Sequence, residues 1–144
     1  MADTELWVFD RTQADLLNGT SKSYINYSDL NRIESRMKEL SELLNEYMYR
    51  QQITVKTDWS KQVSVNDLTN IPTKANLDRM RNNEKVLIDA FFVYPSTPNL
   101  PESFEYLTIY TANDIEKILY DLHLMILDME ENFLECGDIE CMEV

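Results

Sequence analysis

A regular spacing of apolar residues between positions 28 and 51 places the tightest limit on what this chain can fold into. Its members recur every three or four positions: Leu30, Ile33, Met37, Leu40, Leu44 and Tyr47. This spacing puts all six side chains on one stripe of an α-helix. Charged residues fill most of the intervening positions, so the opposite face suits water. The sequence therefore predicts a long amphipathic helix over 28–51, with Ser28 as its N-cap.

Two further segments predict long helices over 111–134 and 72–92. The stripe of the first consists of Ile115, Leu119, Leu122, Ile126, Met129 and Phe133, behind Thr111 and Asp114 at the spacing of a capping box. The stripe of the second consists of Leu77, Met80, Leu87, Ile88 and Phe91, with an interruption at Asn83-Glu84. That interruption is either a buried polar contact that fixes register or a helix rotating out of the core, and we favour the rotation.

The predicted fold is mainly α, a single domain over 1–144. Only six of the 144 residues are Gly or Pro, which suits long helices. We expect a three-helix bundle with an N-terminal arm and short helix over 1–27 and an acidic tail over 135–144. β-branched residues between 53 and 70 predict an extended, β-like loop between the first and second long helices.

The net charge of −13 constrains the class of partner. Residues 113–144 contain ten acids and one base. Such a balance disfavours binding to nucleic acid or to an anionic membrane, because phosphate binding depends on Lys and Arg. No apolar run approaches the roughly 18 residues that a membrane span needs. We interpret the acidic segment as a solvated face and tail; the alternative is a mimic of DNA charge or a docking patch for a basic partner.

Residues that carry out chemistry are sparse. The two glycines lie too far apart for a phosphate-binding loop. His123, the only histidine, lies between two leucines of the last predicted helix, and we expect it on the helix surface or at the edge of the core rather than as a catalytic base. Together with Cys136 and Cys141 it falls short of the four ligands of a structural zinc site, and whether these cysteines pair is left open. We therefore expect a non-enzymatic protein without a catalytic residue, metal, cofactor or small-molecule substrate.

Aromatic residues outside the three stripes predict contacts with other subunits. Rigid aromatic rings supply contact area at low entropic cost. The candidate partner-binding residues are Leu6, Trp7, Phe9, Tyr24, Tyr27 and Trp59. For Trp59, a lid over the protein core is the alternative. We also expect a homo-oligomer, because assembly into symmetric homo-oligomers is common.

Four segments resemble a family of short proteins encoded by tailed phages and prophages of Gram-positive bacteria. They are Asp10-Arg11-Thr12-Gln13-Ala14-Asp15, the stretch 27–34, Val55-Lys56-Thr57-Asp58-Trp59-Ser60, and the stretch 94–119 with Pro98-Asn99-Leu100-Pro101 and Ala112-Asn113-Asp114-Ile115-Glu116-Lys117. They occur in the family's order and are distributed between residues 10 and 119, over most of the chain's length.

The resemblance implies a virion structural protein, made in the host cytoplasm. Its expected place is the tail tip, the baseplate or the attachment of a fibre, and its expected partners are other tail or baseplate proteins. The alternative of another class is a small acidic inhibitor that mimics DNA and binds a basic host protein. Its support is the concentration of acids in residues 113–144.

Overall fold

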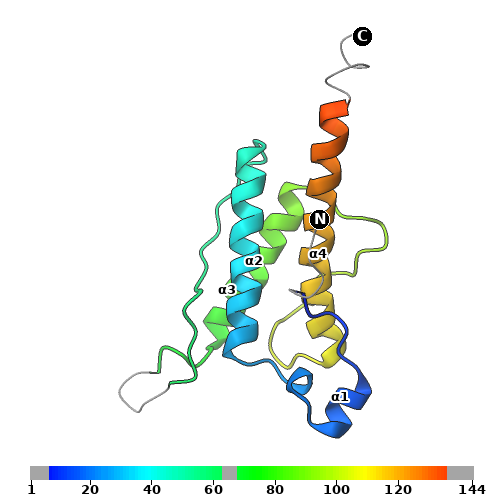
Figure 1. Ribbon diagram of the computed structural model, residues 1–144. Helices are drawn as coiled ribbons and strands as arrows, with labels where there is room; N and C mark the ends of the chain where they lie inside the picture. The colour runs from blue at the N-terminus through cyan, green and yellow to red at the C-terminus, as the bar shows by residue number, and fades with distance from the viewer. Residues whose placement is uncertain (1–6, 63–67, 136–144) are drawn as a thin grey trace.

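The computed structural model describes residues 7–62 and 68–135 and confirms the mainly α prediction (Figure 1). Its elements are α1 (Gln13–Asn18), the 3₁₀ turn η2 (Ser21–Ser23), α2 (Tyr27–Glu46), α3 (Lys74–Ala90) and α4 (Ile109–Glu135). The described residues include no β-strand. The three long helices therefore correspond to the three apolar stripes, with shifted ends.

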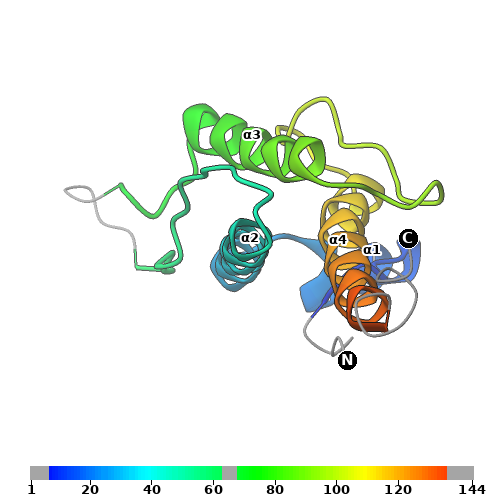
Figure 2. The same ribbon diagram turned by 90° about the horizontal axis from the view of Figure 1, so that it is seen from above.

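The core lies between α2, α3 and α4. Seen from above, α2 and α4 stand side by side while α3 lies across them (Figure 2). The apolar side chains that are at most 1% exposed all lie on these three helices: Met37, Leu40, Leu44, Leu87, Ile115, Ile118, Leu119, Leu122 and Ile126. Burial of these aliphatic side chains is the main force that joins the helices, at about 1.5–3 kcal/mol each.

The N-terminus of α2 is capped by Asn26, and the prediction of Ser28 as the N-cap is wrong. Asn26 Oδ1 accepts hydrogen bonds from the Ser28 and Asp29 backbone N–H groups, and the Asp29 carboxylate accepts from the Asn26 N–H. This is a reciprocal capping box, built two residues earlier than the predicted cap. The Ser28 hydroxyl donates to Asn26 Oδ1 at 2.6 Å and so supports the cap.

The C-terminus of α2 lies at Glu46, five residues before the predicted end at Gln51. Met48 adopts a left-handed backbone with a φ of 72°, which turns the chain back. The Gln51 side chain then donates to the Ser41 carbonyl and accepts from the Ser41 hydroxyl. Since Gln51 bonds to the flank of α2, it cannot extend the same helix.

Threonines begin the other two long helices. Thr73 accepts from the Asn76 N–H and caps α3, in agreement with the predicted start. At α4 the capping partners are Thr108 and Thr111, whose hydroxyls each accept from the other's backbone N–H. The predicted Thr111–Asp114 box is therefore displaced by three residues, and the helix begins at Ile109.

The described part of the segment after α2 is held by side chains of α2, without strand pairing. Asn31 bonds to both backbone groups of Trp59, accepting from its N–H at 2.7 Å and donating to its carbonyl at 2.8 Å. Trp59 Nε1 donates to the buried Glu34 carboxylate at 2.5 Å, and so does the Lys56 N–H at 3.1 Å. Trp59 is 3% exposed and forms a lid over the core.

Arg79 on α3 completes this arrangement. It forms an ion pair with Glu34 and donates to the Thr54 carbonyl at 2.7 Å. Glu34 is fully buried, so its charge depends on these donors. The Arg79–Glu34 pair thus joins α2, α3 and the 54–59 segment.

The Asn83-Glu84 interruption does not rotate out of the core; this interpretation is wrong. Asn83 is buried and donates to the Thr54 carbonyl at 2.6 Å, a buried polar contact. Glu84 is fully buried, and neither carboxyl oxygen has a hydrogen-bond partner. Burial, and then the nearby charge of Glu116, raise the pKa of Glu84 well above its ordinary value.

Replacement of Arg79 by Met should destabilise the fold strongly. The variant leaves the Glu34 carboxylate buried without its cation, a change that typically costs about 3 kcal/mol or more. Chemical denaturation at neutral pH measures this loss. Lys85→Met on the same helix is the control, because Lys85 forms an exposed pair with Asp89 and its loss should be nearly neutral. Equal effects of the two variants would contradict the role given to Glu34.

Replacement of Glu84 by Gln should stabilise the protein increasingly as the pH rises. The folded state holds the Glu84 proton more tightly than the unfolded state, so wild-type stability falls between the ordinary pKa of 4.5 and the raised one. The gain of Glu84→Gln over wild type should be smallest below pH 4.5 and grow by up to about 1.4 kcal/mol per pH unit above it. Denaturation of both proteins across this range measures the difference, and a pH-independent difference would refute the explanation.

Candidate functional site

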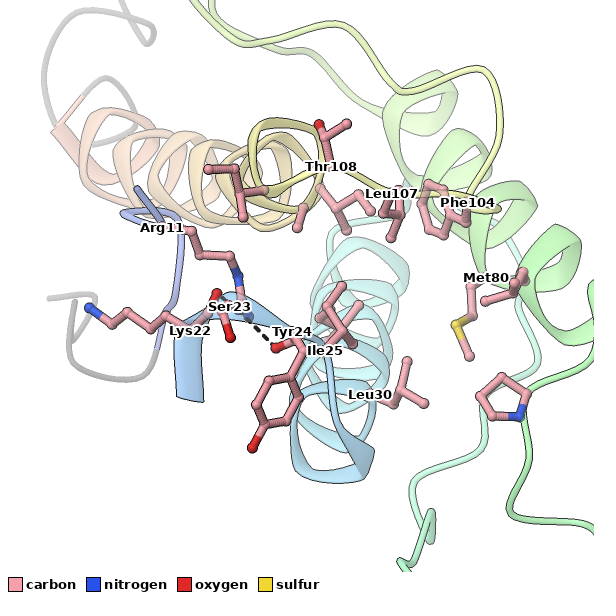
Figure 3. A pocket seen from close by; sticks show the side chains of 16 residues that line it. Arg11, Lys22, Ser23, Tyr24, Ile25, Leu30, Met80, Phe104, Leu107 and Thr108 are labelled. Carbon is pink, nitrogen blue, oxygen red and sulfur yellow. Dashed lines mark hydrogen bonds between the residues drawn. The ribbon is translucent and has the colours of Figure 1, made fainter. Parts of the chain in front are cut away.

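A groove of about 460 Å³ lies beside the starts of α2 and α4 (Figure 3). Both helices begin at the same end of the molecule (Figure 1). Its walls come from the arm, the α1–α2 connector, α2, α3 and the start of α4. The lining residues are Arg11, Lys22, Ser23, Tyr24, Ile25, Leu30, Ile33, Pro72, Leu77, Met80, Phe104, Leu107, Thr108, Ile109, Ala112 and Ile115. Most of these are apolar, which is typical of a binding groove for apolar groups.

Arg11 holds the polar wall of this groove. Its guanidinium is buried and donates through Nη1 to the carbonyls of Lys22 and Tyr24, at 2.7 and 3.2 Å (Figure 3). Nη2 pairs with Asp29 at 3.4 Å. The Asn113 side chain on α4 bonds to both the N–H and the carbonyl of Arg11. One residue therefore joins the arm, the connector, α2 and α4.

The ion pair of Arg32 with Glu116 links α2 to α4 behind this wall. Arg32 also pairs with Asp29 at 2.8 Å, and Glu116 accepts from the Val8 N–H at 2.8 Å. Burial works to lower the pKa of Arg32, but the hydrogen bonds and charges of Glu116 and Asp29 outweigh it and raise that pKa. Arg32 therefore stays charged, and the groove is held by a chain of alternating charges.

The described part of the arm packs on α4 of its own chain. The rings of Trp7 and Tyr120 pack in a T-shaped arrangement with their centroids 5.5 Å apart. The Arg36 guanidinium lies 5.0 Å from the centroid of the Trp7 ring. Phe9 also packs on Tyr120, with ring centroids 5.0 Å apart. Trp7 is 7% exposed and Phe9 half-buried, so the arm covers its own core. Leu6 lies outside the described residues.

The predicted partner-binding residues thus divide into two groups. Trp7 and Trp59 belong to the core, which leaves them no surface to offer a partner in this conformation. Tyr24 and Tyr27 are 55% and 39% exposed and lie at the groove end. The structure adds exposed residues that the pattern analysis missed: Leu16 and Leu17 on α1, and Tyr106 and Tyr110 at the start of α4.

We call these six exposed residues (Leu16, Leu17, Tyr24, Tyr27, Tyr106 and Tyr110) the end surface. Tyr106 is 98% exposed and Leu17 79% exposed. A missed signal was the Leu16-Leu17 pair in a helix too short to bury one face. Exposed apolar residues at the same end of the molecule as an apolar groove are typical of a protein–protein contact.

Groups that could hold a metal do not gather in the described residues. His123 is half-buried, 5.9 Å from the Trp7 ring, and burial followed by the charge of Arg36 lowers its pKa. Within 7–62 and 68–135, no cluster of three or more His, Cys, Asp or Glu side chains could bind a metal. In the same ranges no helix is long and apolar enough to span a membrane. Cys136 and Cys141 lie outside them.

Comparisons with protein-family models, with curated proteins and with solved structures gave no match to this chain. The groove, the end surface and the distribution of charge therefore provide the physical basis for a functional hypothesis.

Replacement of Arg11 by Ala should loosen the connector that forms the groove wall. The variant removes both hydrogen bonds to the connector carbonyls and leaves Asp29 with one cation fewer. We expect a loss of about 3 kcal/mol in the free energy of unfolding and faster proteolytic cleavage between residues 18 and 26. Denaturation and limited proteolysis with mass spectrometry measure the two effects.

Lys22→Ala is the control for this variant, since Lys22 forms an exposed pair with Asp10 and its carbonyl remains. Its stability and cleavage rate should match those of wild type. An Arg11→Ala protein with unchanged cleavage would show that Arg11 does not hold the connector.

Proposed function

We propose that this chain is a non-enzymatic structural component of a phage virion that binds neighbouring subunits through the end surface and its groove. The observation that carries the contact is the apolar groove, which is lined in part by the exposed ring of Tyr24. The place in the particle, a tail, baseplate or fibre-attachment region, rests on the resemblance of the 10–15, 27–34, 55–60 and 94–119 segments. Synthesis in the host cytoplasm and assembly into the virion follow from the same proposal.

The physical support for a binding role is the preorganisation of the groove. Its polar wall is fixed by Arg11 and the Asp29–Arg32–Glu116 pairs, so a partner would meet a formed surface. A preformed site avoids part of the ordering cost of association. Tyrosines around it suit an interface, because their rings offer large area with few rotatable bonds.

We further propose that α2, α3 and α4 act as one three-helix bundle, the rigid body that presents this groove. The buried pair of Glu34 with Arg79 and that of Arg32 with Glu116 support this reading, because they join α2 to α3 and to α4. In this reading the 53–70 segment is an extended loop held on the bundle.

A second candidate function is a small acidic inhibitor that binds a basic host protein. The observation that favours it is the far end of α4, which extends beyond α2 and α3 (Figure 1) and carries Asp128, Glu130 and Glu131. The Tyr47 hydroxyl donates to Glu130 at 2.6 Å, and this bond raises the pKa of Tyr47 to about 12. The Glu130 carboxylate is thus fixed in position on a negatively charged surface.

Virion composition tests the first proposal. Mass spectrometry of purified particles should detect the chain at a constant ratio to the tail proteins. Tyr24→Asp should reduce its incorporation at least about tenfold, because it places a charge at the proposed contact. Met48→Asp is the matched control: Met48 is 70% exposed and lies at the opposite end of α2, and its left-handed backbone tolerates Asp.

Absence of the chain from purified particles would refute the virion proposal. Combined replacement of Glu130, Glu131, Glu135 and Asp138 by their amides separates the two candidates. It should leave incorporation intact under the first proposal, whereas under the second it should abolish capture of the basic host protein.

A further inference from the structure

Helix α1 is held in place by polar bonds although it buries none of its own residues. Six residues are too few for a stable helix in water, so its shape needs other support. That support is a full capping box between Thr12 and Asp15, and Gly19 closes the other end with a φ of +62°. Thr20 also donates to the Asp15 carboxylate at 2.8 Å. The chain thus fixes a short helix that adds nothing to its core.

As a result, α1 presents an exposed apolar projection that consists of Leu16 and Leu17. Leu17 is 79% exposed and Leu16 is 45% exposed. The connector that follows α1 forms one wall of the groove (Figure 3), so the groove and the projection lie at the same end of the molecule. The end where α2 and α4 begin therefore carries both an apolar groove and an apolar projection. Within the described residues, Leu17 of this projection packs against no other part of the chain closely enough to be buried.

Net charge does not oppose self-association at this end. The three segments that supply nearly all of the groove lining, 11–33, 72–80 and 104–115, contain five bases and five acids, so their net charge is zero. The full chain carries −13, so the remaining residues carry all of the excess negative charge. Like-charged surfaces repel on approach. Two copies can therefore meet at this end without the repulsion that they would meet elsewhere.

The exposed area is sufficient for a specific contact. The four tyrosines of the end surface are 55%, 39%, 98% and 62% exposed. With about 150–250 Å² for a full aromatic side chain, they present on the order of 500 Å². Leu16, Leu17 and the groove walls add to this area. A standard interface buries about 800 Å² on each partner, so a second copy is of the right size to cover this end.

We propose that two copies of this chain meet end to end about a two-fold axis, each inserting Leu17 into the groove of the other. Because projection and groove lie at one end, two facing copies satisfy both at once and close the assembly. The inference rests on the proposed function, since it names a second copy as the neighbouring subunit at the end surface. The dimer would then be the unit that enters the particle.

Solution mass of the purified full chain tests this inference. Light scattering during size-exclusion chromatography, over a concentration series, should give a dimer. Leu17→Asp should raise the dissociation constant at least about thirtyfold, because it places a charge in an apolar groove. Tyr24→Asp should weaken the dimer from the other side of the contact. Its backbone carbonyl still accepts from Arg11, so the groove wall remains. Met48→Asp should remain dimeric.

Circular dichroism and thermal melting of all variants distinguish a lost contact from a lost fold. A monomer at every concentration, or a Leu17→Asp dimer as tight as wild type, would overturn the inference. A monomeric chain that is still found in virions would refute the dimer and leave the proposed function standing. A chain that is dimeric in solution but absent from virions would refute the virion proposal and leave the dimer standing.

Discussion

Buried carboxylates that bind segments distant in sequence are the interaction on which this structure depends. Glu34 accepts from the Trp59 indole and the Lys56 backbone and pairs with Arg79. Glu116 accepts from the Val8 backbone and pairs with Arg32. A buried carboxylate without its donors is costly, so each has essentially one arrangement of neighbours that satisfies it. These two residues thereby fix where the irregular segments lie on the helices.

The groove forms at an end of the core where irregular chain, rather than a helix, forms part of the wall. Apolar packing joins α2, α3 and α4 along their stripes, but at the end where α2 and α4 begin the walls are irregular chain. Arg11 holds that chain by its carbonyls, which fixes a wall without filling the space behind it. A groove therefore persists where an apolar side chain would otherwise complete the core. Its position beside α1 gives the molecule one distinctive end.

The net charge differs between the two ends of the molecule. The groove-lining segments balance five bases against five acids, whereas the far end of α4 is acidic. A neutral, aromatic end suits contact with another subunit, and an acidic end keeps the remaining surface from associating with copies of itself. Under the virion proposal this division sets the direction of assembly. Under the inhibitor proposal the acidic end is the functional one.

The sequence by itself determined the helices, because each stripe records which face of one helix avoids water: Leu30 to Leu44 for α2 and Ile115 to Ile126 for α4. Helix ends were less predictable, since Asn26 and Thr108 compete with neighbouring caps of similar chemistry. Only the tertiary structure decided that Trp59 is a lid, because its partner Glu34 lies 25 residues away on another element. The same holds for the groove, whose lining comes from three separate segments of the chain. Local periodicity says which face is buried, whereas a site depends on which buried faces and charges meet, and that is decided only by packing.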